Sequence, residues 1–268
     1  METKIIPPYI KNPNEDRNGI LSYRPQKQEK GLREDERSEL MEKAYGDGYG
    51  TFVDNLIVSW AADQARKESS KKNRKLIFAE IGGGYGCFYD KVKDICANYL
   101  NVEPSDLEDK FNFAARINES DFFQLQASAE EIPITDSEVD IAIALASLDH
   151  VPNTDKAIAE IARVLKPGGM LIFSLNNKGS WWKKLLRNSK HLKKRESEIL
   201  KDHYILWDSD NAKEAIKGHL TPEAINTICH CPQIPYAWKA IINPVNFLGS
   251  RLAPKLGSNI VAIFRKPF

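Results

Sequence analysis

Short apolar runs alternate with helical patterns through the middle of the chain. Each run has the length of a buried strand, and the five runs are residues 76–81, 99–103, 122–126, 139–146 and 170–175. The spacing of apolar residues predicts helices over 85–98 and from Asn153 or Thr154 to Leu165. This alternation is typical of βαβ units, and it predicts an α/β fold built on a parallel sheet.

The N-terminal flank lacks this alternation. Residues 1–34 are polar and interrupted by prolines, so we expect an irregular arm without a fold of its own. Residues 35–65 have a helical pattern that must break near residues 46–50, where three glycines stand. The Lys- and Arg-rich stretch 66–75 is expected to be a solvated linker between this helical lead and the first strand.

The alternation also stops after Leu175. Residues 176–232 are expected to form a helical insert or lid, which includes a basic amphipathic helix over 181–201. A second helix is predicted to start at Thr221-Pro222-Glu223, because Thr is a good N-cap and Pro suits the first helical turn.

The C-terminal part, 233–268, contains two candidate strands. They cover 236–242 and 259–265, and as a pair returning to the sheet they would make it a mixed sheet. We therefore expect a single domain over 35–268, with its core at 76–175.

Composition places the chain among globular proteins. It has 268 residues, with 38 Lys and Arg against 37 Asp and Glu. A charge this balanced disfavours binding to nucleic acid, because such domains usually carry a strong basic excess. The cysteines (Cys87, Cys96, Cys229 and Cys231) are too few and too scattered for a secreted disulfide scaffold. No segment has the pattern of a secretory signal or a membrane span, so we expect a cytoplasmic protein.

A glycine-rich segment, Glu80-Ile-Gly-Gly-Gly-Tyr-Gly86, lies between the first predicted strand and the helix after it. Its glycines, Gly82, Gly83, Gly84 and Gly86, allow a sharp turn and a close approach of a ligand to the backbone. A phosphate-binding Walker loop would need a following Gly-Lys, and a dinucleotide loop a glycine or alanine where Cys87 stands. Glu103 ends the second strand, where a carboxylate can accept bonds from ribose hydroxyls. The spacing supports a ribose-bearing cofactor and does not choose between S-adenosylmethionine and a nicotinamide.

The pattern acidic-x-Gly-x-Gly-x-Gly, with Glu80 as the acid, resembles motif I of the class I S-adenosylmethionine-dependent methyltransferases. Further segments similar to the group related to the ubiquinone and menaquinone methyltransferases follow in order: Ala127–Pro133, Glu138–Asp140, Leu148–Val151 and Arg163–Gly169. The resemblance covers about residues 76–175. It implies a Rossmann-like sheet of seven strands, with helices on both faces and the last strand antiparallel.

The same resemblance implies the cofactor and its contacts. The cofactor would be S-adenosylmethionine, with S-adenosylhomocysteine as its product. Ser128, Ala129 and Glu130 would border the adenine, and Ala144–Ser147, including Ala146, would line the wall behind the sulfonium.

Asp149 and His150 are the candidate catalytic residues. The family often has two histidines after the fourth strand, and here the first of the two positions is Asp149. Either side chain could assist removal of a proton from an acceptor hydroxyl, and an imidazole suits neutral pH. The alternative is structural, with Asp149 capping the turn and His150 packed under the sheet edge.

Four aromatic or imidazole side chains outside the core are candidates for the acceptor site or its lid: Tyr45, Tyr49, Trp181 and His219. The basic helix 181–201 would be a lid or would contact an anionic or membrane-linked acceptor. We expect no metal, because Cys229-His-Cys231 lacks a second ligand pair at zinc spacing.

The sequence therefore predicts a methyltransferase acting on a small molecule, with a hydroxyl of a sugar or specialised metabolite as the leading acceptor. The alternatives are carbon methylation of a quinone, a non-catalytic protein that binds S-adenosylmethionine, and a nicotinamide-dependent oxidoreductase. Nucleic acid is disfavoured as the acceptor, because the Asn/Asp-Pro-Pro-Tyr segment typical of amino methylation is absent after strand four. Both a monomer and a homodimer are compatible with the sequence.

Overall fold

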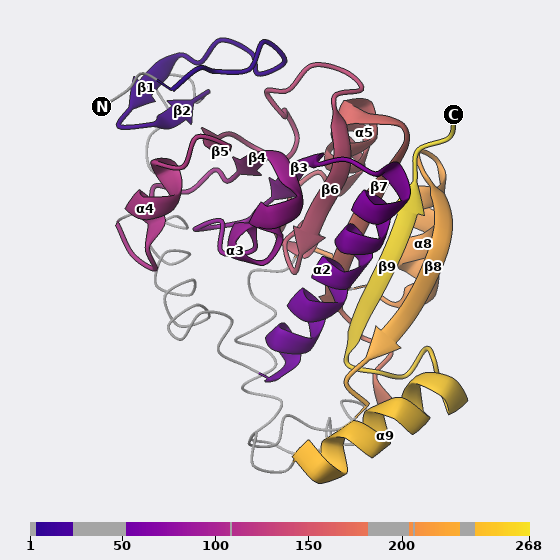
Figure 1. Ribbon diagram of the computed structural model, residues 1–268. Helices are drawn as coiled ribbons and strands as arrows, with labels where there is room; N and C mark the ends of the chain where they lie inside the picture. The colour runs from indigo at the N-terminus through magenta and orange to yellow at the C-terminus, as the bar shows by residue number, and fades with distance from the viewer. Residues whose placement is uncertain (1–3, 24–51, 108, 182–203, 206, 231–238) are drawn as a thin grey trace.

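A computed structural model describes residues 4–23, 52–107, 109–181, 204–205, 207–230 and 239–268 (Figure 1). Within these residues, nine strands form one sheet in the order β1-β2-β5-β4-β3-β6-β7-β9-β8. The strands are β1 (Glu15–Arg17), β2 (Ile20–Ser22), β3 (Leu76–Ile81), β4 (Cys96–Val102), β5 (Phe122–Gln126), β6 (Val139–Leu145), β7 (Leu165–Asn176), β8 (Thr221–Ile228) and β9 (Asn259–Arg265).

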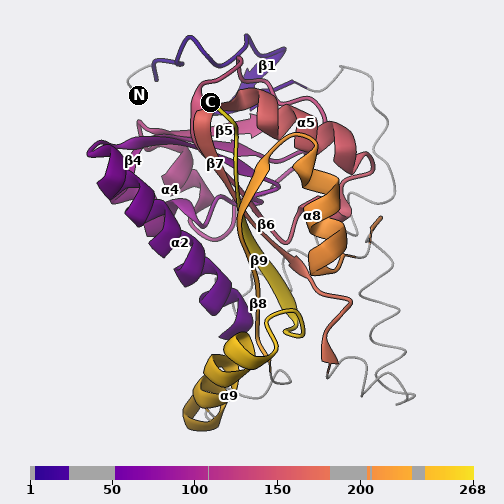
Figure 2. The same ribbon diagram turned by 90° about the vertical axis from the view of Figure 1, so that its right-hand side faces the viewer.

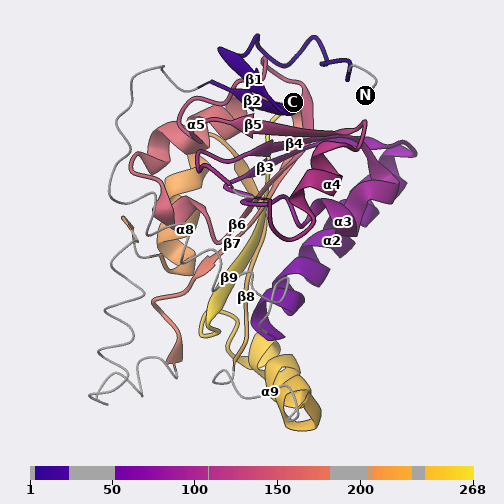
Figure 3. The same cartoon turned by 90° about the vertical axis from the view of Figure 1, so that its left-hand side faces the viewer.

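The helices cover both faces of the sheet. They are α2 (Phe52–Lys72), α3 (Tyr89–Val92), α4 (Phe113–Ile117), α5 (Thr154–Val164), α8 (Ser209–Lys217) and α9 (Lys239–Leu252), with 3₁₀ turns η1 (Lys93–Ile95) and η2 (Leu148–His150). Helix α2 lies on one face, and α5 and α8 lie on the other (Figures 2 and 3). Each face has its own apolar core, because alternate residues of β3, β6 and β7 point to opposite sides. None of the described helices is long and apolar enough to cross a membrane.

The predicted mixed α/β sheet is confirmed, but the part of the chain that the structure describes forms nine strands rather than seven. Strands β3 to β7 run parallel where they pair, and β9 is antiparallel to both β7 and β8. The two extra strands come from the segment predicted to be an irregular arm. Ile20–Ser22 pairs with Gln124–Gln126 of β5, and Leu21 is buried there. The arm acquires structure because β5 would otherwise leave its backbone groups unpaired at the sheet edge.

The predictions for the first βαβ unit were partly wrong. Strand β3 has the predicted bounds, but the helix expected over 85–98 is only one turn, and β4 already begins at Cys96. The glycine loop continues as turns up to Phe88, so little chain remains for a helix. The stretch 66–75 is not a linker, because α2 extends to Lys72 and Arg66 pairs with Asp94.

The C-terminal predictions contain two further errors. Thr221-Pro222-Glu223 begins the edge strand β8 instead of a helix, and Lys239 begins α9 where a strand was predicted over 236–242. Pro222 is tolerated in β8 because an edge strand has a side that needs no N–H donor. The strand predicted over 259–265 is present as β9.

Candidate cofactor and acceptor site

The glycine loop follows β3 directly and turns through left-handed backbone conformations. Gly82, Gly84 and Gly86 have φ angles of +67°, +52° and +67°. A Cβ atom on Gly82 would lie 2.6 Å from the Cβ of Ser147, so the loop also packs against the turn after β6. Side chains are excluded at Gly82 by both conformation and space, which explains the glycine there.

Glu80 lies beneath this loop. Its Oε2 atom accepts a hydrogen bond of 2.7 Å from the Tyr99 hydroxyl, and a Cβ atom on Gly83 would collide with both Glu80 Oε2 and Asn101 Oδ1. Burial raises the pKa of Glu80 to about 8, against the opposing effect of the Tyr99 hydrogen bond. Glu80 is therefore mostly protonated at neutral pH, and its contacts are with the base of the loop.

A protonated Glu80 also supplies a donor that the loop lacks. Within the described residues, no donor reaches the buried Asn101 Oδ1. Asn101 itself donates to the Gly84 carbonyl and to Gln124 Oε1, each at 2.7 Å. A proton on Glu80 can satisfy Asn101 Oδ1, because both oxygens face the space above Gly83.

Glu103 joins the end of β4 to the glycine loop. Its Oε2 atom accepts from the Gly84 N–H and its Oε1 atom from the Ser105 N–H, each at 3.0 Å. Each carboxylate oxygen has a further lone pair, which suits the hydroxyls of a ribose. The Glu103 residue is only 2% exposed, so a ribose reaches it only after the groups that cover it move.

The turn predicted to border an adenine is fixed by its own hydrogen bonds. Ser128 Oγ donates to Glu130 Oε2 at 3.0 Å, and the Asn153 N–H donates to Glu130 Oε1 at 2.7 Å. Ala129 between them is buried. The Glu130 carboxylate thus ties the turn to the start of α5.

The turn after β6 brings Asp149 and His150 to the same edge of the sheet. Ser147 Oγ donates to the Ile81 carbonyl at 2.6 Å, and Ala146 is exposed with a φ of +51°. The Asp149 carboxylate is buried, whereas the His150 side chain is 37% exposed. His150 Nε2 lies 3.9 Å from Asp149 Oδ1. Of the two candidate residues, His150 is the one that a ligand can reach.

The structure brings only some of the other candidates to this edge. Trp181 follows β7, is 43% exposed, and donates from Nε1 to the His230 carbonyl at 3.1 Å. His219 was misplaced by the sequence prediction: it precedes Thr221, which pairs with Arg265 at the opposite edge of the sheet. Tyr45 and Tyr49 lie outside the described residues, as does the basic helix predicted over 181–201 apart from Trp181.

Two contributors to the site were missed from the sequence: Tyr99 and Asn101. Asn101 carried a signal, because a polar side chain interrupts the apolar strand β4. Tyr99 carried no such signal, since its contact with Glu80 depends on which strands are neighbours. Among the described residues, no cluster of His, Cys, Asp and Glu side chains could hold a metal ion.

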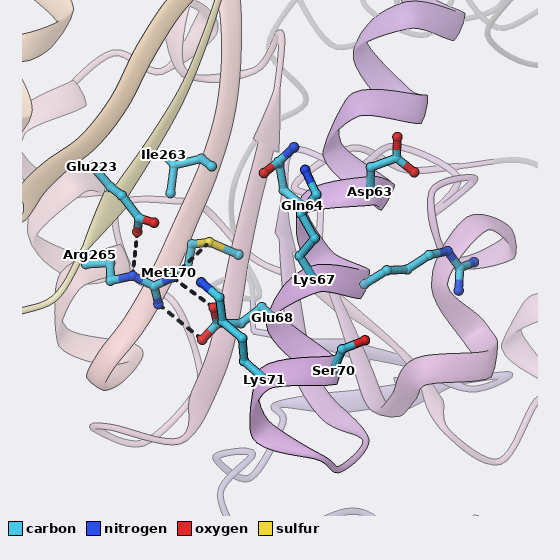
Figure 4. Close-up of a pocket in the computed structure, with 11 residues that line it drawn as sticks. Asp63, Gln64, Lys67, Glu68, Ser70, Lys71, Met170, Glu223, Ile263 and Arg265 are labelled. Atoms are coloured by element: carbon cyan, nitrogen blue, oxygen red, sulfur yellow. Dashed lines mark hydrogen bonds and ion pairs between the residues drawn. The ribbon is translucent and has the colours of Figure 1, made fainter.

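A cavity of about 560 Å³ lies elsewhere, between α2 and the strands β7, β8 and β9 (Figure 4). Arg265 crosses it to bind Glu68 at 2.8 Å and Glu223 at 2.5 Å, above Met170 and Ile263. Its charges therefore largely neutralise one another. Because it lies toward the edge opposite the glycine loop, we assign the functional site to the loop.

Comparison with known proteins supports this assignment. Residues 79–173 match a family described as "Methyltransferase domain". An uncharacterized methyltransferase of Mycobacteroides abscessus is 33% identical over 130 residues, which cover 47% of this chain and 49% of that protein. A sterol 4-C-methyltransferase of Caenorhabditis elegans is 35% identical over 96 residues, which cover 35% of this chain and 29% of that protein. The chain spans about half the length of the first of these relatives, and less of the second.

Solved structures share the fold. The 1,6-didemethyltoxoflavin N1-methyltransferase of Burkholderia thailandensis matches with a TM-score of 0.55 at 14% identity, covering 91% of this chain and 94% of that one. The phosphoethanolamine N-methyltransferase 2 of Haemonchus contortus matches with a TM-score of 0.51 at 15% identity, covering 73% of this chain and 49% of that one. The family match over the glycine loop and its neighbouring strands, set in this fold, shows that the chain contains a class I S-adenosylmethionine-dependent methyltransferase domain.

Proposed function

We propose that the protein transfers a methyl group from S-adenosylmethionine to a hydroxyl of a small molecule, such as a sugar or a specialised metabolite. The observation that carries this proposal is the meeting of three elements at one sheet edge. The glycine loop, the Glu103 carboxylate and the His150 imidazole all follow the carboxyl ends of parallel strands. Ligands of open α/β sheets bind at that edge.

The residues present fit the cofactor. The backbone of Gly82 to Gly86 would lie against its amino-acid part, Glu103 would accept from the ribose, and Ser128 to Glu130 would border the adenine. Ala146, exposed on the turn after β6, would line the sulfonium side. When bound, S-adenosylmethionine supplies an electrophilic methyl group.

His150 is the proposed base. Methyl transfer is an in-line displacement, so the protein must hold the acceptor oxygen about 3 to 3.5 Å from the methyl carbon. The exposed imidazole would take the hydroxyl proton as the oxygen–carbon bond forms and the methyl–sulfur bond breaks, with S-adenosylhomocysteine as the leaving group. The buried Asp149 carboxylate, 3.9 Å away, stabilises the resulting imidazolium and so acts through His150.

Transfer of radiolabelled methyl from S-adenosylmethionine to fractionated small-molecule extracts tests the proposal. We expect one small-molecule fraction to acquire label, and His150→Gln to lower the rate by about 10²- to 10⁴-fold. Lys213→Gln, at an exposed position on α8, is the matched control and should leave the rate unchanged. Turnover by His150→Gln equal to that of the unmodified chain would show that the imidazole is not the base.

Carbon methylation is the second candidate, because one relative is named a sterol 4-C-methyltransferase. Mass-spectrometric location of the label on the product separates the two. A label on carbon would identify a carbon atom, rather than a hydroxyl oxygen, as the methyl acceptor. The proposed cofactor site would be unaffected by that result.

A further inference from the structure

We propose that helix α9 docks the protein onto an anionic phospholipid surface. Helix α9 lies beyond the end of β8 and β9 and projects from the body of the fold (Figures 1 and 2). It connects Ile228 to Asn259, which both lie at the carboxyl edge of β7, the edge that also carries the glycine loop.

One face of α9 is apolar and open to solvent. Val245, Leu248 and Leu252 are spaced i, i+3, i+7 on the helix and are 39%, 53% and 81% exposed. Phe247, 54% exposed, lies about 100° round the helix from Leu248 and widens the apolar face. Single exposed apolar residues are ordinary, but an aligned row on one helix marks an interaction surface.

The helix is fixed so that this row faces outward. A Cβ atom on Gly249 would lie 2.5 Å from the Cβ of His230, so the helix backbone rests directly on that buried side chain. After the helix, Thr227 Oγ donates to the Pro254 carbonyl at 2.6 Å and Ser258 Oγ to the Cys229 carbonyl at 2.8 Å. With its inner side held at these points, the helix cannot rotate its apolar row into the core without breaking the contacts.

The charges around the row have the sign that an anionic surface requires. Residues 239–255, which include the helix, contain three Lys and Arg and no Asp or Glu. Arg251 lies on the helix next to Leu252, with its guanidinium 4.2 Å from the centre of the Phe247 ring. Lys255 follows the helix and is largely exposed, where it forms a surface ion pair of 2.7 Å with Asp210 that lipid phosphates can compete for. An apolar row flanked by cations is the pattern of a helix that lies in a membrane interface.

The size of the row favours lipid over a second protein. A stable protein interface covers about 800 Å² on each partner, more than four side chains provide. An interfacial helix needs only a few apolar anchors and adjacent cations. Docking would turn the glycine-loop edge toward the lipid, which would suit a lipid-soluble acceptor; only this last consequence rests on the proposed function.

Sedimentation of the full chain with vesicles tests the docking without cofactor or acceptor. We expect binding to vesicles of 3:1 phosphatidylcholine and phosphatidylglycerol, weakened by salt, and little binding to pure phosphatidylcholine. The double variant Leu248→Gln, Leu252→Gln should lower the partition coefficient by at least about tenfold, because it removes two apolar anchors without changing charge. Thermal unfolding should be unchanged, since both side chains are exposed.

Lys213→Gln on α8 serves as the control and should bind vesicles like the unmodified chain. Three results would overturn the proposal: no binding to anionic vesicles, equal binding to both vesicle types, or undiminished binding by the double variant. The unmodified chain could instead self-associate without binding vesicles, and the double variant could be a monomer. That outcome would assign the apolar face to contact with a second copy of the chain. Because none of these measurements uses methyl transfer, they are independent of the proposed reaction.

Discussion

Replacing Glu80 by Gln should make the protein more stable at neutral and alkaline pH. Burial raises the pKa of Glu80 from 4.5 to about 8, and the carboxyl is therefore protonated in the fold while it is ionised in the unfolded chain. The folded state must take up a proton between these two pKa values. Stability from Glu80 is thus fully present below about pH 4.5 and is lost as the pH rises to about 8.

The size of the effect follows from the width of that window. Each pH unit within it costs about 1.4 kcal/mol, so the loss reaches about 3 kcal/mol at pH 7. Glutamine cannot ionise in either state. Its amide oxygen can still accept from the Tyr99 hydroxyl, so the variant keeps this contact of the neutral acid without the titration.

Urea unfolding followed by tryptophan fluorescence, from pH 5 to pH 8.5, measures the difference between the two proteins. The free energy of unfolding of Glu80→Gln, relative to that of the unmodified chain, should rise steadily with pH up to about pH 8. Above that pH the difference between the two proteins should stay constant. Other titrating groups are common to both proteins and cancel. Glu131→Gln, at an exposed position, is the control and should show no such divergence. If the free energies of unfolding of Glu80→Gln and of the unmodified chain instead differ by the same amount at every pH, Glu80 is ionised in the folded protein. That result would refute the reasoning.

Two further predictions concern stability. Asp140→Asn should cost about 2 kcal/mol at pH 7: burial raises the pKa of Asp140, but Arg74 and its other partners outweigh this and hold it at about 2. Urea unfolding should show this difference above about pH 4 and its loss as the pH falls toward 2. Gly249→Val should lower thermal stability by about 1 to 3 kcal/mol through collision with His230, whereas Gly218→Ala, with open space at its Cβ, should be nearly neutral. Equal melting temperatures for these two variants would contradict the packing of α9.

Elements buried on both faces could be predicted from sequence, and elements at the edge could not. Strands β3, β5 and β9 have their predicted bounds, because burial on both faces requires strands made mostly of apolar residues. Strand β8 is an edge strand with an exposed, mixed surface, and its Thr-Pro-Glu start is also a good helix start. The start of α9 was mistaken for a strand because a short apolar run does not distinguish the two.

In the site, too, features that are local in sequence could be predicted, and features that depend on the order of the strands could not. The glycine loop was found because its left-handed angles require glycine, and that requirement is local in sequence. The Tyr99 bond to Glu80 joins two neighbouring strands, so it depends on sheet order rather than on spacing. His219 was placed at the wrong edge for the same reason, since the direction of β8 is set by its pairing with β9.

Calorimetry with S-adenosylhomocysteine tests the cofactor site most directly. We predict that the unmodified chain and the Lys213→Gln control bind both S-adenosylhomocysteine and S-adenosylmethionine. Gly84→Asp should abolish binding, because it places a side chain and a negative charge in the loop next to the Glu103 carboxylate. Tight binding of NAD with no response to either methionine derivative, or unchanged affinity in Gly84→Asp, would contradict a cofactor site at the glycine loop.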